Sequence, residues 1–192
     1  NERMQDIAEK VSPMMTEYSM YVSLNEPLFA RVKAVHESGV ALEQDQATLL
    51  DKTWKSFVRG GANLGAEDKA TYSKLSEELS LLTLQYGKNV LAATNAFTLN
   101  LTEEADLEGL PEFVREAAVE TAKSKNMDGW AFDLSAPSYG AFMKYSTRRD
   151  LRQKMWMAYN TRATEGDNSN IELCRQIAEL RLKIANILGY ET

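Results

Sequence analysis

Hydrophobic residues recur along most of the chain every three or four positions, the spacing of an α-helix. The clearest case is the run from about 66 to 95, where Leu75, Leu79, Leu82 and Tyr86 step by four and three. The same rhythm, interrupted by only four prolines and ten glycines, predicts eight helices. Their expected ranges are 3–22, 25–38, 42–60, 66–95, 111–126, 137–145, 147–162 and 169–188.

Two short segments alternate instead in the two-residue period of a β-strand. These are "FTLNL" at 97–101 and "GWAFDL" at 129–134. Two strands alone are marginally stable, so we expect them to pair as a small ribbon against helices. The predicted fold is mainly α, a bundle-like module of several helices with a two-stranded β ribbon. We expect residues 1–192 to form a single helical module.

Several helix ends have recognisable capping signals. Asn25 is a predicted N-cap, with Pro27 in the first turn, where its missing N–H group costs nothing. Gly60, followed by a second glycine, is a plausible C-cap. Thr147 and Asp150 resemble a capping box at the start of a helix.

The segment "MAYNTRATEGDNSNIE", residues 157–172, joins two predicted helices through a run of polar residues. Ser169 and Glu172 have the spacing of a second capping box. Capping accounts for most of the polar residues here, so we interpret the segment as a structural corner between two helices. Arg162 is left unexplained by capping, and we expect it to tether neighbouring helices or domains.

Composition excludes several classes of protein. Hydrophobic residues make up 44% and charged residues 26% of the 192 residues, as in ordinary globular proteins. The net charge of −6 argues against nucleic-acid binding, which needs an excess of Lys and Arg. One basic run stands out, and we interpret it as a solvated helix face rather than an anion site. It consists of Lys144, Arg148, Arg149, Arg152 and Lys154.

The single cysteine, Cys174, rules out an intrachain disulfide and favours a reducing compartment, so we expect a cytoplasmic protein. No apolar run approaches the length of about 20 residues needed to cross a membrane, so no membrane association is expected. The chain begins at Asn1 without an initiator methionine and stops at Thr192 directly after a predicted helix. We therefore expect it to be a piece of a longer protein.

Candidate catalytic chemistry is sparse. The only histidine, His36, and the only cysteine, Cys174, fall on different predicted helices. A catalytic zinc ion usually needs three protein ligands, and the H-E-x-x-H pattern does not occur. His36 is better explained as a surface residue near a helix C-terminus, and Cys174 as a small apolar residue beside a helix stripe. No catalytic, cofactor-binding or metal-binding residue is assigned from the sequence.

Carboxylates cluster at Glu103, Glu104, Asp106 and Glu108, after the first strand. A pair of carboxylates can bind a cation or share a proton, but this loop lacks the alternating oxygen ligands of a calcium loop. We therefore interpret it as a solvated turn. "EGDNSN", at 165–170, fails as an EF-hand because no glutamate closes it.

Apolar side chains offer a further possibility, a ligand pocket or a partner surface. Met155, Trp156 and Met157 point to different faces of one helix, and core packing is the simpler explanation. A contiguous exposed apolar face would instead mean that a partner is missing. The first predicted helix has an apolar stripe of its own, formed by Met4, Ile7, Ala8, Val11, Met15, Tyr18 and Val22.

Four segments taken in order resemble one region of the M3 family of zinc metallopeptidases. They are "LLDKTWKSFVRGGANL", "LTLQYGKNVLAATNAFTLNLTEEADLEGLP", "FDLSAPSYGAFMKYSTRRDLRQKMWMAYNTRAT" and "IAELRLKIANILGYET". Together they cover nearly the whole chain. Within the family, they are most similar to the group of peptidyl-dipeptidase Dcp and oligopeptidase A, relatives of thimet oligopeptidase.

This resemblance implies a large helical peptidase whose two halves surround a channel for short peptides. Its zinc ion would sit on an H-E-x-x-H helix in a later catalytic region, and no position here matches that motif. The chain would be the non-catalytic helical region upstream, a wall of the channel, with the catalytic region of the same parent chain as its partner. By itself it should bind no zinc and cleave no peptide. The alternative is a free-standing helical protein-interaction module without enzymatic activity.

Overall fold

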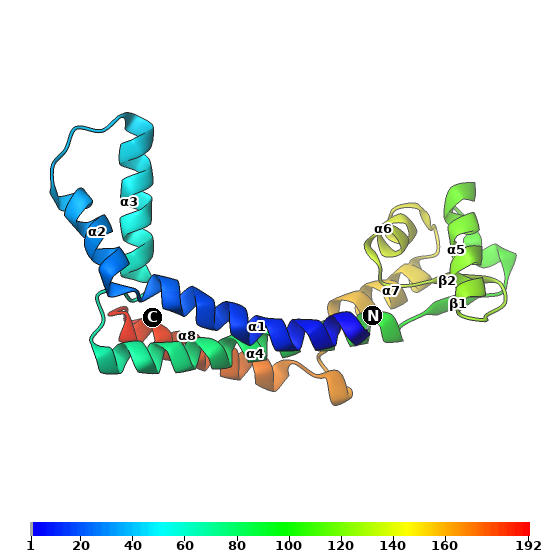
Figure 1. The fold of residues 1–192 in the computed structure, drawn as a ribbon. Coiled ribbons are helices and arrows are strands. Elements are labelled where there is room, and N and C mark those ends of the chain that lie inside the picture. Colours follow the sequence, from blue (N-terminus) through cyan, green and yellow to red (C-terminus); the bar gives the residue numbers. More distant parts are fainter. Residues whose placement is uncertain (1) are drawn as a thin grey trace. The chain divides into compact units, whose positions relative to one another are not determined.

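The computed structural model describes residues 2–192 and confirms a mainly α fold with a small two-stranded sheet (Figure 1). Its boundaries differ from the predicted ones by up to two residues, and two short 3-10 helices, η1 and η2, were not predicted. The elements are α1 (Glu2–Ser23), α2 (Glu26–Glu37), α3 (Gln44–Arg59), α4 (Ala66–Ala96), β1 (Leu99–Leu101), η1 (Glu104–Leu107), α5 (Glu112–Ser124), β2 (Trp130–Phe132), α6 (Ala136–Tyr145), α7 (Arg149–Asn160), η2 (Gly166–Asn168) and α8 (Ile171–Ile187).

The chain divides into two compact units. Unit 1 contains the described residues up to Gln85 together with Leu173–Thr192, and unit 2 is Tyr86–Glu172. The long helix α4 therefore begins in unit 1 and ends in unit 2.

Unit 1 is built from α1, the first part of α4, most of α8 and a hairpin of α2 and α3 (Figure 1). Aromatic rings hold the hairpin together. The ring centroids of Phe29 and Phe57 lie 5.8 Å apart, and the His36 ring stacks on Trp54 at 4.4 Å. Among the hydrophobic residues described in unit 1, very few are fully buried, so this unit has little core of its own.

The predicted caps of α2 and α3 are confirmed. The Asn25 side chain accepts a hydrogen bond from the backbone N–H of Leu28 at 2.9 Å, and Pro27 lies in the first turn. Gly60 is the C-cap of α3. These signals could be found in the sequence because a cap involves residues within one helical turn of each other.

Unit 2 has a conventional hydrophobic core. Strands β1 and β2 pair antiparallel, with Leu99 opposite Phe132. Helices α5, α6 and α7 supply further core side chains, and Leu107 of η1 and the loop residues Leu110 and Leu134 complete the core. The largest fully buried side chains are Phe132, Phe142, Leu107 and Met155.

Gly129 allows the chain to enter β2. Its φ of +83° lies in the left-handed region, which side chains other than glycine rarely adopt. A Cβ atom at this position would lie 2.2 Å from the carbonyl oxygen of Leu101 in β1. The close approach of the two backbones therefore requires glycine.

The predicted capping box at Thr147 and Asp150 is wrong. Helix α7 begins at Arg149, and Thr147 instead donates its hydroxyl hydrogen to the carboxylate of Glu108, with an Oγ1–Oε2 distance of 2.9 Å. Helix α8 begins at Ile171, and the Ser169 hydroxyl accepts a hydrogen bond from the backbone N–H of Ile171 at 3.4 Å. The capping role of Ser169 is therefore supported, and its pairing with Glu172 stays a prediction.

Candidate docking surface

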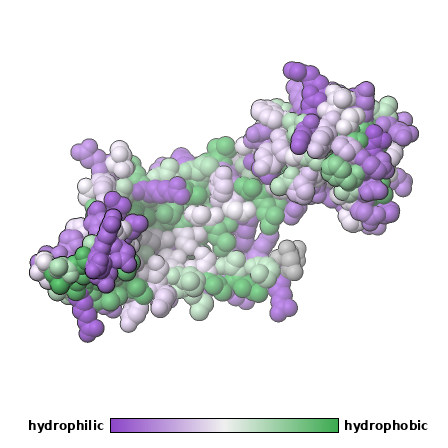
Figure 2. Space-filling model, turned by 90° about the horizontal axis from the view of Figure 1, so that it is seen from above, coloured by the Kyte–Doolittle hydropathy of each residue, from purple (hydrophilic) through white to green (hydrophobic). Residues whose placement is uncertain are grey.

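Helix α1 exposes its hydrophobic face. Seven large apolar side chains on this helix have between 43% and 69% of their surface exposed. They are Met4, Ile7, Val11, Met14, Met15, Tyr18 and Tyr21. Figure 2 shows hydrophobic residues, in green, at the surface of unit 1. An exposed apolar face of this kind is typical of an interaction surface.

Ser12 of α1 contacts α4. Ala8, Ser12 and Thr16 are half-buried at helical spacing, and the hydroxyl oxygens of Ser12 and Ser80 are 2.8 Å apart. Short side chains let two helices approach closely. Because α1 turns this face toward α4, its predicted apolar stripe faces mainly toward solvent.

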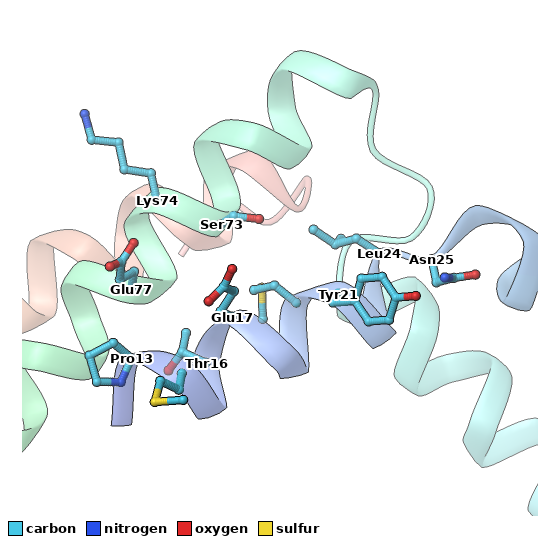
Figure 3. A pocket seen from close by; sticks show the side chains of 11 residues that line it. Pro13, Thr16, Glu17, Tyr21, Leu24, Asn25, Ser73, Lys74 and Glu77 are labelled. Carbon is cyan, nitrogen blue, oxygen red and sulfur yellow. The ribbon is translucent and has the colours of Figure 1, made fainter. Parts of the chain in front are cut away.

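A groove of about 830 Å³ lies between α1 and α4 (Figure 3). Met14 and Tyr21 belong both to this groove and to the exposed face of α1, so the two surfaces are continuous. The lining residues are Pro13, Met14, Thr16, Glu17, Met20, Tyr21, Leu24, Asn25, Ser73, Lys74 and Glu77.

Charge in the groove is mainly negative. In Figure 3 the carboxylate of Glu17 points from α1 toward α4, where Ser73 and Glu77 lie, whereas Lys74 extends away from α1. Within the part of the chain that the structure describes, neither Glu17 nor Glu77 forms an ion pair. The groove therefore combines apolar walls with two carboxylates that lack a cationic partner.

The two candidate metal or nucleophile residues take other roles. His36 lies in the last turn of α2, as predicted, and its ring stacks on Trp54. Cys174 is exposed on α8, so its interpretation as a packed apolar residue is wrong. Over residues 2–192, no three His, Cys, Asp or Glu side chains gather in a way that would hold a metal ion.

The acidic loop after β1 is only partly a solvated turn. Asp106 forms an ion pair with Arg148, which also binds the Asp150 carboxylate at 2.9 Å. Glu108 accepts the hydrogen bond from Thr147. The loop and the start of α7 are therefore joined by side chains from both sides.

These contacts also correct the interpretation of the basic run as a solvated face. Hydrogen bonding to Asp150, with the nearby Asp106 carboxylate, raises the pKa of Arg148. The same hydrogen bond lowers the pKa of Asp150. Arg152 donates to the backbone carbonyl of Ser146. Lys144 Nζ lies 5.0 Å from the centroid of the Tyr145 ring. Three of the five basic side chains thus have structural partners.

The corner between α7 and α8 is held to α4 by Arg162, as expected for a tether. Its Nε donates to the carbonyl oxygen of Tyr159 at 2.8 Å, and its guanidinium lies over the Tyr159 ring, 3.7 Å from the centroid. Its Nη1 donates to Thr94 of α4 at 3.2 Å. The predicted contact between neighbouring helices is confirmed.

A second link was missed in the sequence. Asn170 is buried and accepts a hydrogen bond from the side-chain amide of Asn89 on α4 at 2.9 Å. It also donates to the backbone carbonyl of Tyr86 at 3.1 Å. Ser169, the predicted cap, bonds to the Thr164 carbonyl. The only signal in the sequence for a link between this corner and α4 is the run of polar residues before α8.

The Met–Trp–Met triplet divides between core and surface. Met155 is fully buried in the core of unit 2, while Trp156 and Met157 are about half exposed. The interpretation as core packing is confirmed for the first residue only.

No helix in residues 2–192 is both long and apolar enough to span a lipid bilayer. No protein-family model matches the chain. Individual proteins, however, match it over nearly its whole length. The chain is 32% identical over 195 residues to oligopeptidase A of Escherichia coli, and the match covers 98% of the chain. It is 34% identical to oligopeptidase A of Haemophilus influenzae over 94% of the chain, and 30% identical to dipeptidyl carboxypeptidase of E. coli over 99%.

The chain belongs to the M3 family. The resemblance found in its four sequence segments is thereby confirmed. The chain spans 29% of the length of the E. coli oligopeptidase A and 28% of that of the dipeptidyl carboxypeptidase. It therefore corresponds to one part of these larger peptidases.

Proposed function

We propose that this chain is a non-catalytic helical part of an M3 zinc metallopeptidase that degrades short peptides. The proposal rests on one observation: nearly all of the chain aligns with less than a third of each peptidase relative. The exposed apolar face of α1 supports it, because the remainder of a larger enzyme would cover such a face.

In this proposal the catalytic zinc ion belongs to another region of the parent polypeptide. The residues described here do not fit a zinc site, because His36 stacks on Trp54 and Cys174 is exposed on a different helix. A zinc site of this type needs three protein ligands that converge. No catalytic, cofactor-binding or metal-binding residue is therefore assigned to this chain.

The contribution of this part to the enzyme would be structural. We infer that its helices form a wall of the substrate channel and pack against the catalytic region of the same polypeptide. The parent enzyme would be a cytoplasmic peptidyl-dipeptidase acting on short peptides. That residues 1–192 act as one helical module within it stays a prediction.

A free-standing protein-interaction module is the second candidate, because an exposed apolar face also suits a separate partner. The coding sequence of the gene discriminates between the two. The peptidase proposal predicts an H-E-x-x-H motif a few hundred codons after Thr192. A stop codon directly after Thr192 would contradict the peptidase proposal and favour the interaction module.

A further inference from the structure

The exposed face of α1 has the dimensions of a helix-binding surface. Its seven exposed apolar residues, from Met4 to Tyr21, fall within an arc of about 120° around the helix axis, at about 100° per residue. Over these positions the helix rises by about 26 Å. An apolar stripe this wide and continuous packs best against the side-chain ridges of another helix.

Methionine dominates this surface. Four of the eight methionines of the chain lie on α1, and Met14 and Met20 also line the groove. Methionine side chains are unbranched and polarisable, so they adapt to the shape of an apolar helix in a groove. Tyr18 and Tyr21 add large aromatic surface, which commonly contributes most to binding at interfaces.

The charge of the groove selects the kind of helix. The carboxylates of Glu17 and Glu77 have no cationic partner within the described residues, and Lys74 extends away from α1 (Figure 3). A basic residue on the incoming helix would complete two ion pairs at the edge of an apolar contact. A second copy of this chain would instead bring like charges together.

We propose that the α1–α4 groove and the adjoining face of α1 bind a basic amphipathic helix from the remainder of the parent polypeptide. This inference rests on the proposed function, since in the relatives more than two thirds of the length lies outside the aligned part. It goes further in naming the surface and the chemistry of the helix that covers it.

Site-specific photocrosslinking in the full-length parent protein tests the location. Tyr21 is replaced by p-benzoylphenylalanine, the protein is irradiated, and the crosslinked peptides are identified by mass spectrometry. The expected product joins this position to a helical segment of the same polypeptide that carries Lys or Arg. Crosslinks to a second copy, to an added peptide substrate or to an acidic segment would each overturn the proposal.

Charge reversal tests the ion pairs, with a matched control on the neighbouring residue. Glu77 lines the groove, whereas Glu78 is also exposed on α4 but does not line it. In a parent protein with a protease site inserted after Thr192, Glu77→Arg should weaken the association of the cleaved parts about tenfold at low salt. Glu78→Arg should change it less than twofold.

Exchange of the charges separates an ion pair from a structural defect. Reversing the basic residue identified by crosslinking should restore association in the Glu77→Arg protein. If Glu77→Arg and Glu78→Arg have equal effects, or if the exchange does not restore association, the charge assignment is wrong. A parent gene without a peptidase region would refute the proposed function, whereas crosslinks elsewhere within such a region would refute only the groove assignment.

Discussion

The buried pair Asn89 and Asn170 gives a quantitative test of how the corner before α8 is anchored. Asn170→Ala removes two hydrogen bonds, one from the Asn89 amide and one to the Tyr86 carbonyl. Asn89 and Asn170 are only 8% and 4% exposed, so water cannot readily replace these bonds. At about 1 kcal/mol for each bond and about 1 kcal/mol for the desolvated amide, unfolding of unit 2 should become about 3 kcal/mol easier.

Urea unfolding followed by tryptophan fluorescence measures this change. Trp54 lies in unit 1, whereas Trp130 and Trp156 lie in unit 2. In a Trp54→Phe background the fluorescence therefore reports on unit 2 alone, which avoids treating the two units as one transition. A loss of about 3 kcal/mol should lower the midpoint by about 1–3 M urea without changing the slope.

A double-mutant cycle and a control complete the test. Asn89→Ala combined with Asn170→Ala should cost about 1 kcal/mol less than the sum of the single changes, because both remove the same hydrogen bond. Asn95→Ala, at an exposed position of α4, should change stability by no more than about 0.5 kcal/mol. The reasoning is refuted if Asn170→Ala is as mild as this control, or if the two changes are simply additive.

Three further predictions concern single contacts. Arg162→Ala should destabilise unit 2 by about 1–2 kcal/mol in the same urea assay. Arg162→Lys should cost nearly as much, because lysine lacks the planar group that stacks on the Tyr159 ring. An unchanged midpoint would count against the tether. Gly129→Ala should lower the free energy of unfolding by more than about 2 kcal/mol, because the added Cβ meets a backbone carbonyl. The control Gly140→Ala, in open space on α6, should be neutral or stabilising. Equal effects would contradict the steric argument. The hydrogen bond from Lys69 holds the pKa of Glu26 below its ordinary value of 4.5. The pair therefore stabilises the folded protein above about pH 4.5, and this stabilisation is lost as the pH falls through the folded-state pKa of Glu26. Melting curves should therefore separate wild type from Glu26→Gln at about pH 7 but not at about pH 3, and a difference that persists at low pH would exclude this origin.

The sequence predicted what depends on neighbouring residues. Helical periodicity located the eight helices, and the Asn25 cap was found because its partner, Leu28, is three residues away. The Asn89–Asn170 bond joins residues 81 positions apart, and the Thr147–Glu108 bond joins residues 39 apart. No local pattern identifies such partners, and the capping box predicted at Thr147 failed for this reason.

The docking surface was predictable only in part. Periodicity showed that α1 has an apolar stripe, but an amphipathic pattern does not tell which neighbour covers the stripe. The structure shows that Ser12, outside the predicted stripe, contacts Ser80 of α4. The groove carboxylates Glu17 and Glu77 come from two helices far apart in sequence, and only the fold brings them together.

Peptide cleavage by the isolated chain and by the full-length gene product tests the central claim most directly. Both proteins are incubated with short peptides, with added zinc and with a chelator, and the products are identified by mass spectrometry. The account predicts chelator-sensitive cleavage by the full-length product and none by residues 1–192 alone. Zinc-dependent cleavage by the isolated chain, or a full-length product without metal-dependent peptidase activity, would contradict it.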